Sequence, residues 1–336
     1  MVATAGFAPD GAVIALDYGG NMWKWNLQHG TRQEQDTDLV DVRIGDLGLD
    51  AGSALASNGV FVDVWTSDGR LQRLIDDQPG VRMARLAPAT GSALMAIGNR
   101  LVSVSFDQDP LDVVELGAWD EVHVIAQTSD GHAVALAERD GRLELVRDDG
   151  QSTRFAGTVP TVAGAAIAPD GESFVVVANG VLWRGVDGQT SSTGALVPGV
   201  LSALATTNEG LTVLSGRTRG AWAVDSSGLD LGDICKARVL PTMIEIDDLG
   251  ERVVCVTGSM IVIDELRSLA PAERDQEPPP RTTTVGTAGS LSELSLVDGF
   301  ILIDRADGTT FAIDSTGASF AEDFVPPEAV SEADFF

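Results

Sequence analysis

Lysine and histidine are scarce in this chain of 336 residues, and basic residues as a whole are outnumbered. Only Lys24 and Lys236 are lysine, and the 22 basic residues face 50 acidic ones, for a formal net charge of -28. Binding to nucleic acid or to an anionic membrane surface needs clustered Lys and Arg. The composition therefore argues against both of these partners, and we expect protein partners instead.

Long apolar runs are also missing from the sequence. No stretch approaches the roughly 18 apolar residues that a membrane helix needs. Residues 1–7 lack the basic segment with which a secretory signal peptide begins. We therefore expect a soluble, cytoplasmic protein. Its acidic, lysine-poor profile resembles cytoplasmic proteins of salt-in halophiles, especially haloarchaea, in which concentrated salt screens the repulsion between acidic groups. The alternative is an acidic protein of an ordinary cytoplasm.

Residues that usually carry chemistry are few. Cys235 and Cys255 are the only cysteines and do not have metal-type spacing. We interpret them as two small buried apolar residues, with a disulfide as the alternative. His29, His123 and His132 are too dispersed for a zinc site, so packing or surface roles are expected. Nucleophile-elbow, phosphate-loop and dinucleotide fingerprints are absent. The sequence thus predicts no catalytic residue, cofactor or metal.

Glycine, by contrast, is abundant and periodic. A first series of glycines recurs at intervals near 40 residues, with a longer last step, at Gly11, Gly52, Gly91, Gly131, Gly171, Gly210, Gly250 and Gly299. Four of them follow an aspartate, and Asp-Gly between apolar runs is a strong signal for a hairpin. Two further glycine series follow the first at roughly constant offsets. Such a period indicates an array of similar supersecondary units.

Each unit of about forty residues accommodates four short antiparallel strands, which is one blade of a β-propeller. Near-continuous apolar runs, such as 12–16 and 173–178, are typical of strands buried between stacked sheets. The sequence therefore predicts an all-β propeller. Eight four-stranded blades are expected, with seven as the alternative.

Some of these units resemble the WD40 repeat. The sequence Phe7-Ala-Pro-Asp-Gly11, followed by Met22-Trp-Lys-Trp-Asn-Leu27, resembles its first turn and its tryptophan-bearing third strand. Residues 167–171 with Trp183 are similar, and Trp65 and Trp222 are weaker matches. No blade has the family's Gly-His dipeptide, and no aspartate follows these tryptophans. The resemblance thus implies a divergent WD40-like propeller without the structural His–Asp hydrogen-bond network of that family.

We expect residues 1–325 to form one propeller domain, with a proline-rich, charged insertion loop at 266–284 in the seventh blade. Residues 326–336 are expected to be an acidic, disordered C-terminal tail. The termini show no pattern for exchanging a strand, so closure is expected to rest on packing between the first and last blades. A monomeric propeller is expected.

No motif declares a reaction, so fold analogy favours a non-catalytic protein-interaction scaffold or adaptor. The alternative is a propeller hydrolase or small-molecule-binding protein with its site at the central channel. Tryptophan, arginine and exposed aromatic residues are common in interface hot spots. The partner-binding candidates are accordingly Trp119, Arg217, Arg219, Phe335 and Phe336. The alternative interpretations are that Trp119 packs between blades, that the arginines lie in a solvated turn, and that the tail has no partner.

Overall fold

The computed structural model describes most of residues 2–266 and the strand segments 282–285, 293–297, 300–304 and 310–314. Positions within 2–266 that it leaves undescribed are 8–12, 27–30, 38, 40, 41, 43, 48–52, 67–69, 77, 78, 107–110, 236–240, 242, 247–251, 258 and 259. The described elements are β-strands apart from one 3-10 turn, η1 (Pro88–Thr90). The predicted all-β class is confirmed.

The strands form antiparallel sheets in chain order, numbered here from 1 to 8. Sheet 1 contains β1 (Val2–Phe7), β2 (Val13–Asp17), β3 (Asn21–Asn26) and β4 (Thr31–Asp36). Sheet 2 contains β5 (Ile44–Leu47), β6 (Ala54–Ser57), β7 (Val62–Trp65) and β8 (Leu71–Ile75). Sheet 3 contains β9 (Val81–Ala87), β10 (Ser92–Ile97), β11 (Arg100–Ser105) and β12 (Asp112–Ala118). Sheet 4 contains β13 (Glu121–Gln127), β14 (Ala133–Arg139), β15 (Arg142–Arg147) and β16 (Ser152–Arg154).

The second half of the chain continues this pattern. Sheet 5 contains β17 (Val162–Ile167), β18 (Phe174–Ala178), β19 (Val181–Val186) and β20 (Gln189–Leu196). Sheet 6 contains β21 (Leu201–Thr206), β22 (Thr212–Gly216), β23 (Gly220–Val224) and β24 (Asp230–Ile234). Sheet 7 contains β25 (Met243–Ile246), β26 (Arg252–Thr257), β27 (Met260–Glu265) and β28 (Thr282–Val285). Sheet 8 contains, among the described residues, β29 (Glu293–Val297), β30 (Phe300–Asp304) and β31 (Thr310–Asp314).

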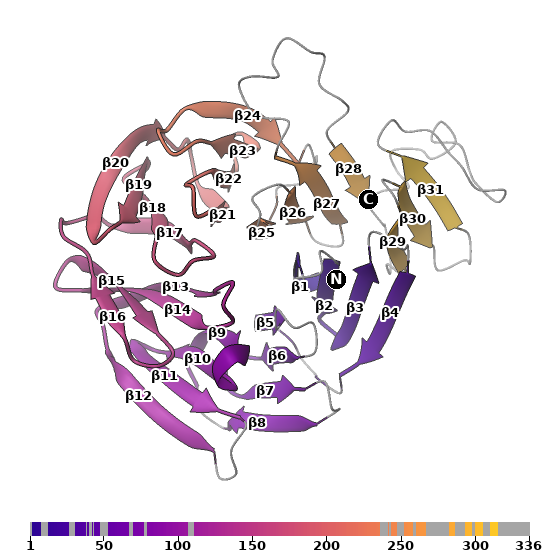
Figure 1. The fold of residues 1–336 in the computed structure, drawn as a ribbon, viewed down its shortest axis with the longest axis horizontal. Coiled ribbons are helices and arrows are strands. Elements are labelled where there is room, and N and C mark those ends of the chain that lie inside the picture. The colour runs from indigo at the N-terminus through magenta and orange to yellow at the C-terminus, as the bar shows by residue number, and fades with distance from the viewer. Residues whose placement is uncertain are drawn as a thin grey trace.

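The sheets are arranged radially around a central axis, as in a β-propeller (Figure 1). The first strands of sheets 1 to 7 face that axis, and each contacts the first strand of the next sheet, from β1 to β25. β25 in turn contacts β1, which brings the two ends of this series together. β29 contacts β3 and β4, the outer strands of sheet 1, and Figure 1 places sheet 8 beside them.

The second strand of a sheet is apolar on both faces because neighbouring sheets cover it on both sides. All residues of β10, β18 and β22 are buried. The apolar core is accordingly divided into clusters that each join adjacent sheets, for example Leu55 with Met95 between sheets 2 and 3, and Val134 with Phe174 between sheets 4 and 5. This packing explains why strict apolar–polar alternation is missing from the sequence.

The periodic glycines occupy the predicted turns. In the described residues, Gly91, Gly131, Gly171 and Gly210 of the first series all have positive φ angles. Gly171 shows why a side chain is excluded there, because a Cβ atom would lie 2.6 Å from the Thr128 side chain, and φ is +69°. Gly11, Gly52, Gly250 and Gly299 lie outside the described residues.

The interpretation of the cysteines as unpaired buried residues is wrong in one respect. Both side chains are buried, as expected, but Cys235 and Cys255 form a disulfide, with a Cα–Cα distance of 6.3 Å. The bond joins the residue after β24 of sheet 6 to β26 of sheet 7. Cys235 has a φ of +45°, a local turn that brings it to the neighbouring sheet. A separation of 20 residues in the sequence does not reveal that proximity.

A His–Asp hydrogen bond is present in sheet 4, at positions other than those of the WD40 pattern, so the expected absence of that family's own network stays a prediction. His132 Nδ1 lies 3.0 Å from Asp148 Oδ1 in sheet 4. The other oxygen of Asp148, Oδ2, accepts hydrogen bonds from Thr90 of η1 and Ser92 of β10, at 2.5 and 3.3 Å. Asp148 follows β15 and has no tryptophan before it, so the WD40 pattern could not reveal this network. These buried and partly buried hydrogen bonds link sheet 4 to sheet 3 and to the turn before β10.

The expected segment boundaries fall mostly outside the described residues. Of the insertion loop 266–284, Leu266 is buried, and residues 282–284 already belong to β28, which pairs with β27. Residues 267–281 and the tail 326–336 are not described. The single-domain boundary at residue 325 stays a prediction.

Candidate functional site

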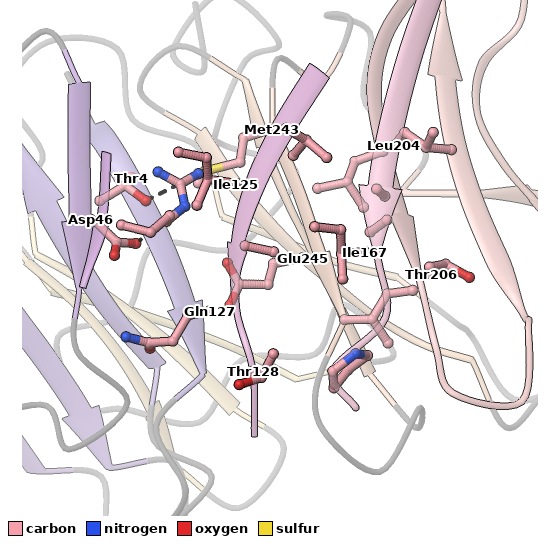
Figure 2. A pocket seen from close by; sticks show the side chains of 18 of the residues that line it. Thr4, Asp46, Ile125, Gln127, Thr128, Ile167, Leu204, Thr206, Met243 and Glu245 are labelled. Carbon is pink, nitrogen blue, oxygen red and sulfur yellow. Dashed lines mark hydrogen bonds and ion pairs between the residues drawn. The ribbon is translucent and has the colours of Figure 1, made fainter. Parts of the chain in front are cut away.

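A cavity of about 210 Å³ lies at the central axis of the ring. Its walls include residues from each of the seven strands β1, β5, β9, β13, β17, β21 and β25. Figure 2 shows the lining side chains from close by, with Asp46 and Gln127 at one side, Leu204 and Thr206 at the other, and Glu245 between them. The cavity is therefore the described part of the central channel, and both polar and aliphatic side chains line it.

Asp46 of β5 is the most deeply buried carboxylate of this cavity. Its Oδ2 accepts a hydrogen bond from the backbone N–H of Leu86 at 2.7 Å, and its Oδ1 lies 3.5 Å from Nε of Arg85. Burial raises the pKa of Asp46, and the opposing effects of Arg85 and of the N–H groups of Leu86 and Leu47 do not cancel that rise. Because the folded pKa exceeds the unfolded one, the contribution of Asp46 to stability declines as the pH rises above about 4.

The other polar side chains of the cavity come from several strands. Gln127 of β13 donates a hydrogen bond through Nε2 to the carbonyl of Leu86 at 2.9 Å. Thr4 of β1 donates a hydrogen bond to the sulfur of Met243 on β25, over 3.7 Å, a contact drawn as a dashed line in Figure 2. Glu245 adds a second carboxylate from β25. The hydrogen bonds of the cavity join neighbouring sheets around the axis: sheet 2 to sheet 3, sheet 3 to sheet 4, and sheet 1 to sheet 7.

Chemically, the cavity can hold a small polar group against a carboxyl–guanidinium pair and cover the rest with aliphatic side chains. Ile125, Ile167 and Leu204 supply that aliphatic surface. Among the residues that the structure describes, no group of three or more His, Cys, Asp or Glu side chains is arranged to hold a metal ion. A buried carboxyl with a raised pKa is a feature of many functional sites, although structural ion pairs produce it as well.

Replacing Asp46 with alanine is expected to lower the free energy of unfolding by about 1–3 kcal/mol, because buried N–H groups lose their acceptor. The groups affected are the backbone N–H of Leu86 and that of Leu47. Asp46→Asn keeps an acceptor oxygen, so its free energy of unfolding should fall by less than that of Asp46→Ala. Denaturant unfolding of the three proteins measures the difference. Equal losses for the two variants would mean that the hydrogen bonds contribute little.

Trp119, a predicted partner-binding residue, is buried between sheets 3 and 4, with 5% of its surface exposed. Its Nε1 donates a hydrogen bond to Glu144 at 3.0 Å, and the guanidinium carbon of Arg139 lies 4.6 Å from the ring centroid. This position matches the alternative interpretation, packing between blades. A role of Trp119 in partner binding stays a prediction.

Arg217 and Arg219 lie in the turn between β22 and β23, but their surroundings differ. Arg219 is bound to the carboxylates of Asp230 and Asp233 of β24, and its guanidinium carbon is 5.2 Å from the ring centroid of Trp222. Its hydrogen bonds hold the pKa of Asp230 below the ordinary value. The Arg217 side chain is exposed. The two arginines are therefore not equivalent, and only Arg217 presents its charge outward.

The two most exposed large apolar residues of the described chain lie at the end of sheet 5 and just before sheet 6. Leu196, the last residue of β20, is 78% exposed, and Val200, in the connection to β21, is 63% exposed. The backbone N–H of Arg217 donates to the carbonyl of Val200 at 3.1 Å. Sequence analysis missed these two apolar residues, because an isolated Leu or Val in an apolar-rich sequence carries no sign of its exposure.

Phe335 and Phe336, the remaining partner-binding candidates, lie outside the described residues, as does His29. His123 and His132 each lie beside a carboxylate of sheet 4, those of Glu138 and Asp148, at 3.1 and 3.0 Å. None of the histidines is brought to the channel cavity in the described residues.

Comparison with known proteins identifies the architecture. No protein-family model matches the sequence, and no curated protein matches it closely. The fold is similar to the Cps50 (Swd1) β-propeller domain of Myceliophteria thermophila, with 14% identity, a TM-score of 0.59, and coverage of 76% of this chain and 93% of that one. Hsv2 of Kluyvelomyces marxianus is 12% identical with a TM-score of 0.57, and the alignment covers 79% of this chain and 92% of that one.

The WD40 repeats of RRP9 are similar as well, with 12% identity, a TM-score of 0.56, and coverage of 77% of this chain and 87% of that one. At such identities the likeness concerns the fold and not the activity. No helix in the described part of the chain is long and apolar enough to cross a membrane. The chain is thus structurally similar to WD40 β-propellers, as the sequence motifs predicted.

Proposed function

We propose that this protein is a non-catalytic protein-interaction scaffold of a high-salt cytoplasm. The observation that carries the proposal is the placement of exposed apolar side chains. In the described residues, large apolar side chains are exposed at the periphery, on outer strands and connections, including Leu71, Val113, Val114, Leu196, Val200 and Leu229. Exposed apolar side chains at the periphery are available for contact with partner proteins. An acidic chain with few lysines favours protein partners over nucleic acid or membranes.

As part of this proposal, the protein is a monomeric ring closed by seven blades, with sheet 8 packed on the outer strands of sheet 1. The contact between β1 and β25, and the hydrogen bond of Thr4 to Met243, support closure through seven sheets. The contacts of β29 with β3 and β4 support a peripheral sheet 8. The sequence period alone favoured eight blades, because it counts repeats and not their radial position.

A second candidate function is the binding or hydrolysis of a small molecule in the central channel. The specific observation in its favour is Asp46, a buried carboxyl of raised pKa beside Arg85 in the channel cavity. Both oxygens of Asp46 already have partners, Leu86 and Arg85, which favours a structural role for this pair. A scaffold role therefore ranks first.

The scaffold function is tested by affinity purification from native cells in molar salt, with the tagged full chain. We expect defined proteins to co-purify in amounts comparable to the bait. An unrelated tagged protein of similar net charge controls for nonspecific binding to an acidic surface. If the bait and this control enrich the same proteins, the proposed scaffold function is wrong.

A further inference from the structure

The end of β20, the connection from sheet 5 to sheet 6 and the β22–β23 turn of sheet 6 carry apolar and cationic side chains that are exposed. Four residues of these segments, Leu196, Val200, Arg217 and Thr218, are called here the Arg217 surface. Leu196 and Val200 are the most exposed large apolar residues of the described chain, at 78% and 63%. Arg217 and Thr218 are exposed as well. The exposure of two large aliphatic residues four positions apart offers apolar surface that a partner could cover.

The backbone of the Arg217 surface is held in place before any partner binds. Val200 accepts a hydrogen bond from the N–H of Arg217 at 3.1 Å, and Pro198 accepts one from the Thr218 hydroxyl at 3.0 Å. At the other end, the N–H of Val197 donates to the carbonyl of Gly180 at 2.8 Å. These bonds link the connection after β20 to the β22–β23 turn and to the β18–β19 turn. Binding would therefore need little ordering of the backbone.

The charge of this surface is opposite to that of the chain as a whole. Within the described part of the chain, the Arg217 side chain makes no hydrogen bond or ion pair, whereas neighbouring Arg219 is held by Asp230 and Asp233. Arg217 contacts the exposed Val200 through the backbone and carries a positive charge on a chain with a net charge of -28. A segment with a negative charge next to an apolar side chain is complementary to this arrangement. Charge complementarity of this kind selects partners and sets their orientation.

We propose that the Arg217 surface binds an acidic segment of a partner protein that carries an aliphatic or aromatic anchor. The anchor packs on Leu196 and Val200, and an adjacent carboxylate pairs with Arg217. In molar salt the charge pair is screened within about 3 Å, while apolar contact is retained, so the anchor supplies most of the affinity. This inference rests on the proposed scaffold function, and it names the surface and the chemistry of the partner.

The proposal is tested by photo-crosslinking in native cells. The full chain is produced with p-benzoylphenylalanine in place of Val200, and a matched control carries it in place of Val60, an exposed valine in the β6–β7 turn of sheet 2. Mass spectrometry identifies the crosslinked peptide. We expect the Val200 probe, and not the Val60 probe, to capture a segment of another protein that is rich in Asp and Glu and contains an aliphatic or aromatic residue.

The captured segment is then synthesised, and its affinity for purified full-chain variants is measured in molar salt. Leu196→Ser is expected to weaken binding by about tenfold or more, as at interface hot spots. Arg217→Glu should weaken it by a smaller factor, because molar salt screens the charge pair. Arg142→Glu is the charge-matched control, an exposed arginine at the start of β15 in sheet 4, and it should bind normally.

Three outcomes would overturn the proposal. In the first, the Val200 probe captures residues 326–336 of the chain itself. In the second, the two probes capture the same segment equally. In the third, the affinity of the synthesised segment is unaffected by Leu196→Ser and by Arg217→Glu. If native partners still co-purify in molar salt while these variants retain them all, the scaffold function stands and only its assignment to the Arg217 surface fails. If nothing co-purifies with the wild-type chain, the scaffold function itself is wrong.

Discussion

Transfer from molar salt to dilute buffer is expected to unfold this protein. The formal net charge of -28 is distributed over 336 residues with only 22 basic side chains to oppose it. The screening length is about 3 Å in 1 M salt and about 30 Å at 0.01 M, so repulsion between surface carboxylates extends across the whole molecule in dilute buffer. The free energy of unfolding of a native protein is about 5–15 kcal/mol. We expect the repulsion between carboxylates in dilute buffer to lower it by about 5 kcal/mol or more.

The measurement is a salt titration followed by circular dichroism and by light scattering for compactness. A charge-reduced variant isolates the electrostatic cause. Its substitutions remove exposed carboxylates at nearly constant shape, Asp112→Asn, Glu172→Gln, Asp187→Asn and Glu209→Gln. This variant should fold at a lower salt concentration than the wild type. A melting temperature that does not change with salt would contradict both the prediction and the proposal of a high-salt cytoplasm.

Removal of the disulfide is expected to lower the free energy of unfolding by about 2–4 kcal/mol. The bond spans 20 residues and covalently joins sheet 6 to sheet 7. In the unfolded chain the crosslink restricts the conformations available, and its loss restores that entropy. Denaturant unfolding of the double variant Cys235→Ala and Cys255→Ala, in molar salt, measures the effect.

Both cysteines are buried, so the alanine substitutions also remove sulfur atoms from a packed cluster. Wild-type protein unfolded in the presence of a reductant separates the two effects, because it lacks the crosslink but keeps the side chains. We expect it to show most of the loss, and the double variant to be insensitive to reductant. Two titratable free thiols in the unreduced wild-type protein would show that the bond is not formed.

The exposure and the partners of the candidate functional residues could not be predicted from the sequence, because both depend on the position of each residue in the fold. Arg217 and Arg219 are separated by one residue and are equivalent in the sequence, yet only Arg219 meets the carboxylates of Asp230 and Asp233. Trp119 has the residue type of a hot spot, but it is covered by sheets 3 and 4. Exposure depends on which side chains the neighbouring sheet brings, and no local pattern encodes that.

What the sequence alone determined is the local architecture. Turn positions, strand lengths and the antiparallel four-stranded unit follow from glycine spacing and short apolar runs, because positive φ at a tight turn and burial between sheets are local requirements. Gly91, Gly131, Gly171 and Gly210 meet that requirement in the structure. Only the tertiary structure decided which residues of neighbouring sheets meet, among them Asp46 with Arg85, Cys235 with Cys255, and those of β1 with those of β25. These pairs join different sheets, so the radial placement of whole sheets determines their distance, and the spacing of residues along the chain does not.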